Sequence, residues 1–257
     1  MSLVLLHRSD GVWLHGLWPI MALVAVCSVP TSEPESSSLD VSHIEDHLKE
    51  RGVPVYSIAL GQTNSLNIIV GYPDKDLPVC SPLNQNSGEQ ESQAVADFHD
   101  LNMLSSFPIS HLTLMNCPAI SNLLPLIDLP LRELNLINCA GIRSLESIRR
   151  LRLVHLLLDR VPVTDLTPIS DFPLESLVLD GTCVTNVSCL AGMKLKAIAF
   201  DPRTVTDGLE AIKGMASLHM INYYYKPSEF WDLYGAGSEP LDIEKTPVEQ
   251  PELYKLK

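Results

Sequence analysis

The feature that most limits the fold is a unit of 21 or 22 residues that occurs five times in succession. Each unit opens with apolar residues in alternation, which is the spacing of a half-buried strand. The alternating pairs are Leu112 and Leu114, Leu134 and Leu136, Leu156 and Leu158, Leu177 and Leu179, and Ile198 and Phe200. Three apolar residues at a spacing of three follow, which suits a helical or 3₁₀ turn. These triplets are Leu123, Leu126 and Leu129; Leu145, Ile148 and Leu151; Leu166, Ile169 and Phe172; Val187, Leu190 and Met193; and Leu209, Ile212 and Met215.

A strand and a helical turn within so short a unit cannot bury their apolar residues alone, but stacked units bury them continuously. The repeat therefore predicts an α/β fold, a leucine-rich-repeat solenoid. We expect a parallel β-sheet on its concave face and short helical or 3₁₀ turns on its convex face.

The segments beside the five units look like irregular end coils. The segment "SLNIIVGYPDKDLPVCSPL" is a degenerate repeat with Leu66 and Ile68, followed by Leu77, Cys80 and Leu83. The segment "NQNSGEQESQ" reads as a polar loop insertion, and Leu101, Leu104 and Phe107 supply a partial coil. "VSHIEDHLKERG" predicts a short amphipathic helix that caps the N-terminal end, and "MINYYYKPSEFW" predicts a cap at the other.

Composition suggests six regions along the chain. The segment from Leu17 to Val29 carries no charge. Its length is about that of the apolar part of a signal peptide and is too short to span a bilayer. An uncleaved anchor and a segment with no targeting role remain alternatives. The expected regions are a signal peptide (1–28), a flexible linker (29–41), the N-terminal cap with the degenerate repeat (42–108), five leucine-rich repeats (109–218), a C-terminal cap (219–237) and a disordered tail (238–257).

The net charge of −13 narrows the class of partner. Nucleic acid binding requires a basic face, and anionic membrane surfaces attract basic segments. We therefore expect a protein partner of unknown identity, no nucleic acid, and membrane contact only through an uncleaved N-terminal segment.

The repeats resemble a bacterial leucine-rich-repeat family that is common in planctomycete and lentisphaeral proteins and often reads T-x-V-T-D-L-S-P-L-x-G-M-P-L. The resemblance covers roughly residues 60 to 237. The matching residues are Thr164, Asp165, Leu166, Pro168, Gly192 and Met193, with Phe230 and Trp231 in the C-terminal segment. Such repeats sometimes follow a Ser/Thr protein kinase domain. This chain has no Gly-rich loop, H-R-D or D-F-G motif, so the resemblance implies the repeat module only.

Residues between the inward leucines should form three columns on the concave face. The columns are His111, Glu133, His155, Ser176 and Ala197; Thr113, Asn135, Leu157, Val178 and Ala199; and Met115, Ile137, Asp159, Asp180 and Asp201.

Each column leaves alternatives open. Zinc accepts two imidazoles and a carboxylate, but strands about 4.8 Å apart spread the first column over about 10 Å, so a cross-strand pair competes with a metal site. The three aspartates either attract a basic partner or cation, or turn toward backbone N–H groups. The apolar residues Met115, Ile137, Leu157 and Val178 are expected to be exposed as a protein contact, unless the C-terminal segment covers them.

Cys117 and Cys139 occupy the same position in successive units. They are expected to be buried thiols, and a disulfide between them is the alternative. The chain has no C-x-x-C and no G-x-S-x-G motif, so the sequence favours a non-enzyme without a cofactor.

The resulting interpretation is a non-enzymatic protein that binds another protein through its concave sheet and is exported or surface-associated in a bacterium. A cytoplasmic scaffold related to the kinase-linked repeat proteins, and a metal-binding site on the concave face, are the alternatives. The expected contacts are His111, Glu133, Asn135, His155, Leu157, Asp159, Val178 and Asp180.

Overall fold

A computed structural model of the chain describes residues 41–50, 52–61, 65–71 and 98–235. The expected signal peptide, linker, polar insertion and tail lie outside these residues, apart from position 41. The second apolar set of the degenerate repeat, Leu77, Cys80 and Leu83, also lies outside them.

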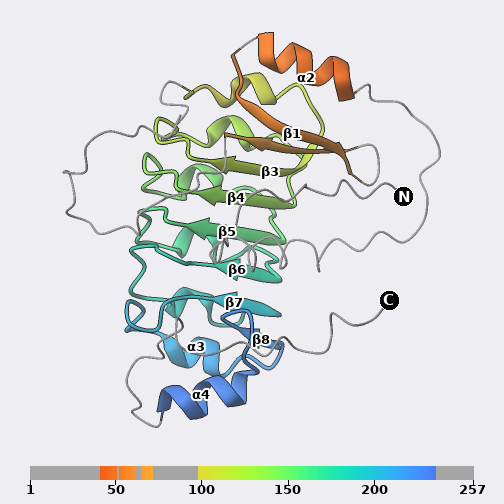
Figure 1. Cartoon of the computed structure of the whole chain (residues 1–257). Helices are drawn as coiled ribbons and strands as arrows, with labels where there is room; N and C mark the ends of the chain where they lie inside the picture. Colours follow the sequence, from red (N-terminus) through yellow and green to blue (C-terminus); the bar gives the residue numbers. More distant parts are fainter. Residues whose placement is uncertain (1–40, 51, 62–64, 72–97, 236–257) are drawn as a thin grey trace, which may run out of the picture.

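Eight strands form one sheet in which spatial order follows sequence order (Figure 1). Strands β2 to β8 are parallel, and β1 pairs with β2 in the antiparallel direction. The solenoid and its sheet are confirmed, with one antiparallel strand that the repeat did not predict. The strands are β1 (Val55–Leu60), β2 (Leu66–Val70), β3 (Ile109–Met115), β4 (Glu133–Ile137), β5 (His155–Asp159), β6 (Ser176–Val178), β7 (Ala197–Ala199) and β8 (Met220–Ile221).

The extra strand β1 forms a hairpin with β2. Ile58 faces Ile68, and Leu60 faces Leu66 across the pair. The sequence contains a local hairpin pattern, in which an apolar and β-branched run is followed by "GQTN" and then by a second apolar run. A search for the repeat pattern alone misses it.

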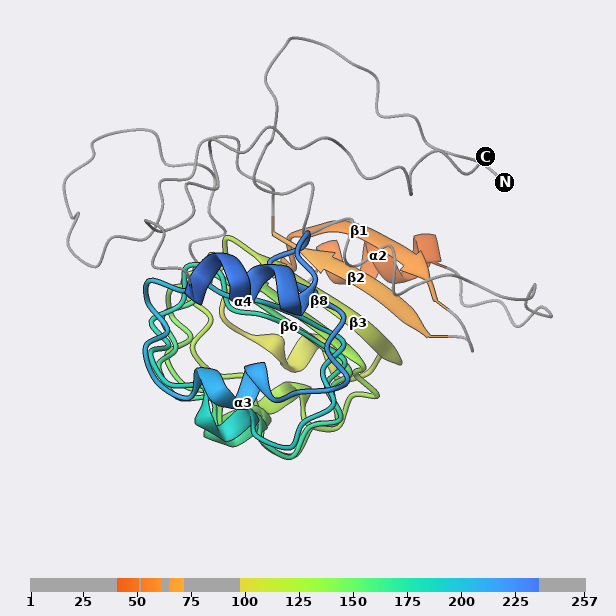
Figure 2. The same ribbon diagram turned by 90° about the horizontal axis from the view of Figure 1, so that it is seen from below.

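Short helical turns lie opposite the sheet (Figure 2). In four successive coils the side chain of Asn122, Ser144, Asp165 or Asn186 accepts the backbone N–H two residues later, at 2.8 to 3.2 Å. This polar position starts each turn by satisfying a backbone donor that the turn leaves open. The turns are η2 (Leu101–Leu104), η3 (Leu124–Leu126), η4 (Glu146–Ile148), η5 (Thr167–Ile169), η6 (Ser188–Leu190) and the short helix α3 (Leu209–Lys213).

The core runs continuously between the sheet and these turns. All ten inward residues of the five repeat strands are at most 2% exposed. The triplets of the turns meet them from the other side, with Leu209 and Met215 of the last coil only partly buried. Each coil therefore depends on its neighbours for burial of its leucines.

Both ends of the core are closed by helices. The amphipathic helix α2 (Val41–Glu50) buries Ile44 and Leu48 at one end, as the sequence predicted. At the other end α4 (Pro227–Gly235) inserts Phe230, whose ring lies edge-on to Phe200 with centroids 5.8 Å apart. None of the helices in the described residues is long and apolar enough to cross a bilayer.

Cys117 and Cys139 are buried, and both are free thiols in the structure. The Cys117 thiol donates to the carbonyl of Met115 at 3.2 Å, and the Cys139 thiol to that of Leu114 at 3.5 Å. Burial, with Cys139 nearby, raises the pKa of Cys117 to about 12, and burial raises the pKa of Cys139 to about 11. Both groups therefore remain protonated packing residues.

The stacking account predicts a large difference between two leucine substitutions. Leu136→Ala leaves a cavity in the core and should lower the free energy of unfolding by about 2 to 5 kcal/mol. Leu124→Ala, at a side chain that is 53% exposed, should change it by about 0.5 kcal/mol or less. Urea denaturation followed by circular dichroism measures both, and equal effects would contradict the continuous core.

Candidate functional site

The strand register places the predicted columns side by side. His111, Glu133, His155, Ser176 and Ala197 pair in succession across β3 to β7. The second column pairs in the same way. In the third column Met115, Ile137 and Asp159 pair, whereas Asp180 and Asp201 follow the ends of the shorter strands β6 and β7.

A hydrogen-bonded group forms around Glu133, which is only 2% exposed. One carboxylate oxygen accepts from the Asn135 amide at 2.8 Å, and the same amide nitrogen donates to Thr113 at 3.2 Å. The Ser110 hydroxyl lies 2.7 Å from Nδ1 of His111. These contacts fix the side chains of two adjacent strands before any ligand arrives.

The two histidines flank this buried carboxylate without forming a metal site. Nε2 of His111 lies 3.7 Å from Oε2 of Glu133, the distance of a weak ion pair. Burial lowers the pKa of His155, although the neighbouring Glu133 carboxylate acts to raise it. In the described part of the chain, no three His, Cys, Asp or Glu residues are placed to hold a metal ion. The cross-strand pairing is thus present for His111, and the geometry of this column lends no support to the metal alternative.

The three aspartates have different partners. Asp159 pairs with the guanidinium of Arg160 at 2.7 Å, and Asp180 accepts from the Tyr223 hydroxyl at 2.6 Å. Asp201 accepts from the backbone N–H of Arg203 at 2.9 Å and also binds its guanidinium. The expected turn toward backbone N–H groups therefore holds for Asp201 and is wrong for the other two.

The charge states of these carboxyls follow from their surroundings. Burial raises the pKa of Asp159 to about 6, with Arg160 opposing this and Asp180 adding to it. Burial also raises the pKa of Asp180, against the hydrogen bond from Tyr223. Although burial acts to raise it, the pKa of Asp201 is lowered by its hydrogen bonds from Arg203. The inner two carboxyls are therefore the costly ones to ionise.

A second apolar cluster lies on the concave face, separate from the main core. We call it the concave cluster, and it consists of Met115, Ile137, Leu157, Val178 and Ala199. The sequence predicted that Met115, Ile137, Leu157 and Val178 would be exposed unless the C-terminal segment covers them. Exposure is wrong, because these side chains are only 1 to 8% exposed. Ile69 of β2 and Tyr223 pack against the cluster, so the C-terminal segment supplies part of the cover.

Sequence reasoning missed the supporting residues of this surface. Ser110, Arg160 and Tyr223 all contact the columns, yet none belongs to a column. Arg160 and Ser110 directly adjoin column members in the sequence, which is a usable signal. Tyr223 lies 43 residues from Asp180, in a segment predicted as an end cap with cover of the concave apolar residues as the alternative, and no spacing pointed to this residue itself.

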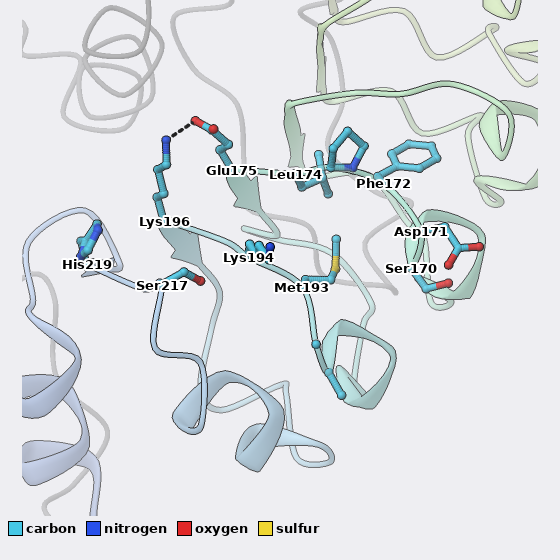
Figure 3. Close-up of a pocket in the computed structure, with 13 residues that line it drawn as sticks. Ser170, Asp171, Phe172, Leu174, Glu175, Met193, Lys194, Lys196, Ser217 and His219 are labelled. Carbon is cyan, nitrogen blue, oxygen red and sulfur yellow. Dashed lines mark hydrogen bonds and ion pairs between the residues drawn. The ribbon is translucent and has the colours of Figure 1, made fainter.

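A shallow groove of about 770 Å³ lies on another side, among the loops that lead into β6, β7 and β8 (Figure 3). Lys196 reaches Glu175 at 2.7 Å, and the Ser217 hydroxyl donates to the carbonyl of Leu195 at 2.8 Å. Three of its polar side chains are thus already engaged. The charged and open rim differs from the enclosed apolar pockets that bind small substrates.

Comparison with known proteins adds little to this description. No protein-family model matches the chain, and no curated protein matches it. Among solved structures, an internalin (InlF) from Listeria monocytogenes is similar, with 17% sequence identity and a TM-score of 0.36. The match covers 50% of this chain and 52% of the internalin, so this chain spans about half of that protein's length. The solenoid is established by strand register and buried leucines.

The surroundings of Asp159 predict a specific pH dependence for Asp159→Asn. The carboxyl has a pKa of about 6 in the folded chain and an ordinary value of 3.8. The folded chain therefore binds more protons between these values, and this carboxyl lowers stability as the pH rises through that window. Asp159→Asn has no carboxyl at this position, so its stability should not fall in this way as the pH rises.

The measurement is the free energy of unfolding of Asp159→Asn minus that of the unmodified protein. The difference should increase by up to about 3 kcal/mol between about pH 4 and about pH 7. Taking the change between two pH values cancels the fixed cost of the substitution. A constant or decreasing difference would show that the carboxyl is not destabilised by burial.

The first column makes a prediction for His155. Glu133→Gln keeps the oxygen that accepts from Asn135 but removes the charge that acts to raise the pKa of His155. The pKa of His155, measured by NMR titration of its ring, should fall further below 6.5. Glu146→Gln, in the convex turn η4, is the matched control and should leave it unchanged. An unchanged value in both variants would contradict the coupling.

Proposed function

We propose that this chain is a non-enzymatic leucine-rich-repeat protein that binds another protein through its concave sheet. The observation that carries the proposal is the concave cluster, because it places apolar side chains on the face of the sheet that is turned away from the core. The repeat fold needs apolar residues only on the inner face. The proposed contacts are His111, Glu133, Asn135, His155, Leu157, Asp159, Val178 and Asp180.

The physical character of the surface supports this proposal. In the free chain the apolar centre is covered by Ile69 and Tyr223, so a partner first meets the polar and charged residues around it, which resemble the polar rim of an interface. Half-buried His111, His155 and Asp180 stand at its edge, where a partner makes first contact. Glu133 and Asn135 are already held by hydrogen bonds, so binding orders few side chains and loses little conformational entropy.

The setting of the protein is part of the proposal. The uncharged segment from Leu17 to Val29 supports an exported or surface-associated protein, and a cytoplasmic scaffold is the alternative. The T-D-L-x-P match at Thr164 to Pro168 supports a relation to the bacterial repeat family of planctomycetes and lentisphaerae. Intact mass and fractionation from the native host separate the two locations.

Site-specific photo-crosslinking tests the binding face. A photoreactive residue is placed at His111 or His155 on the concave face, or at the exposed Arg150 between η4 and β5 as a control. Both concave positions should capture the same protein from the native host, and Arg150 should not. Circular dichroism confirms that each variant is folded. Capture of the same protein from Arg150, or of none from either concave position, would contradict the proposed face.

A further inference from the structure

The chain makes an unusual turn immediately after β8. Asn222 has a φ of +47°, the left-handed conformation that Asn116, Asn138 and Arg160 also adopt directly after their strands. Tyr223 follows with a φ of +66°, a second left-handed residue of a bulky type that rarely adopts this conformation. Ile221 and Tyr225 exchange backbone hydrogen bonds at 2.9 and 3.0 Å, which closes a tight loop over the residues between them. Strained backbone of this kind persists only where surrounding contacts hold it.

Asn222 anchors this loop to the sheet. Its side-chain oxygen accepts the backbone N–H of Phe200 at 2.9 Å, and its own N–H donates to Ile198 at 2.9 Å. Both bonds continue the ladder of β7 beyond the end of β8. The direction of the next side chain, Tyr223, is therefore fixed by the sheet.

Tyr223 extends from this loop onto the concave face. Its ring packs against the concave cluster, and its hydroxyl donates to Asp180 at 2.6 Å. Burial and the neighbouring Asp180 carboxylate raise the pKa of Tyr223, so its hydroxyl keeps the proton that it donates. The adjacent Tyr224 is 48% exposed, so the two tyrosines have different environments.

These contacts are of the kind that a bound side chain from another molecule makes: an aromatic ring on an apolar surface and a hydroxyl on a carboxylate. We propose that Tyr223 is an internal occupant of the concave surface, and that the partner places a tyrosine side chain in the same position. The inference rests on the proposed function for the nature of the partner as a protein. Residues 223 and 224 would then rotate outward while Asn222 stays bonded to the sheet, releasing the left-handed conformation of Tyr223, and Asp180 would accept from the incoming hydroxyl.

A small-molecule probe tests the site without the partner. Tyr223→Gly removes the occupant, and glycine suits the φ of this position, so the fold should persist. The probe is p-cresol, which has the ring and hydroxyl of a tyrosine side chain. At ten times its Kd it should shift the folding equilibrium of Tyr223→Gly about elevenfold and raise Tm by about 3 to 5 °C.

The controls separate the site from general effects of the probe. Tyr224→Ala and the unmodified protein should show a much smaller rise in Tm. Toluene, which lacks the hydroxyl, should raise the Tm of Tyr223→Gly less than p-cresol does. Adding Asp180→Asn should reduce the advantage of p-cresol over toluene. Equal rises in Tyr223→Gly and Tyr224→Ala would overturn the proposal.

A second measurement uses the unmodified protein and therefore does not depend on whether Tyr223→Gly folds. In the unmodified protein, excess p-cresol should increase amide hydrogen exchange at residues 223–225 and leave α4 unchanged. Unchanged exchange in this loop would overturn the idea of a displaceable occupant. Failure of the photo-crosslinking experiment with success here would reject the protein partner while keeping the tyrosine site.

Discussion

Burial of leucine pairs between successive coils is the interaction on which the rest of this structure depends. Leu134 and Leu136 are fully buried only because the coils before and after them supply matching residues. Parallel pairing of β3 to β7 holds those residues in register without a bulge. The short turns complete each coil, and a side chain such as Asp165 starts the turn by accepting a backbone N–H. The energy of the fold is therefore distributed along the stack.

The same register decides what lies on the concave face. Because side chains alternate across a strand, fixing the leucines inward places the intervening residues outward in rows. Glu133 is thereby set beside two histidines, and Ile137 beside Asp159. Burial raises the cost of ionising Asp159 and Asp180, and a neighbouring carboxylate adds to it, Asp180 for Asp159 and Asp201 for Asp180. Arg160 and Tyr223 reduce the cost. Burying two carboxyl groups lowers the stability of the free chain. We propose that they are kept because they take part in binding a protein.

Sequence spacing predicted the coils and columns because both depend on contacts between equivalent positions of neighbouring repeats. It failed where a contact joins unlike parts of the chain. Strand β1 pairs with β2 by a local hairpin that has no repeat pattern. Burial of Leu157 and Val178 could not be predicted from their columns, since it depends on what packs over the sheet. Tyr223 reaches Asp180 only because the chain turns through two left-handed residues. The first, Asn222, matches Asn116 and Asn138 after β3 and β4, but no pattern in the three tyrosines specifies the second.

The central claim is that the concave sheet is the face that binds protein. Methyl NMR of the protein alone and in complex with its captured partner tests this claim most directly. We expect the largest shifts at the methyl groups of Met115, Ile137, Leu157 and Val178, with little change at the core residues Leu126 and Ile148. Shifts confined to the convex turns or to the end helices, with the concave methyl groups unchanged, would contradict the account.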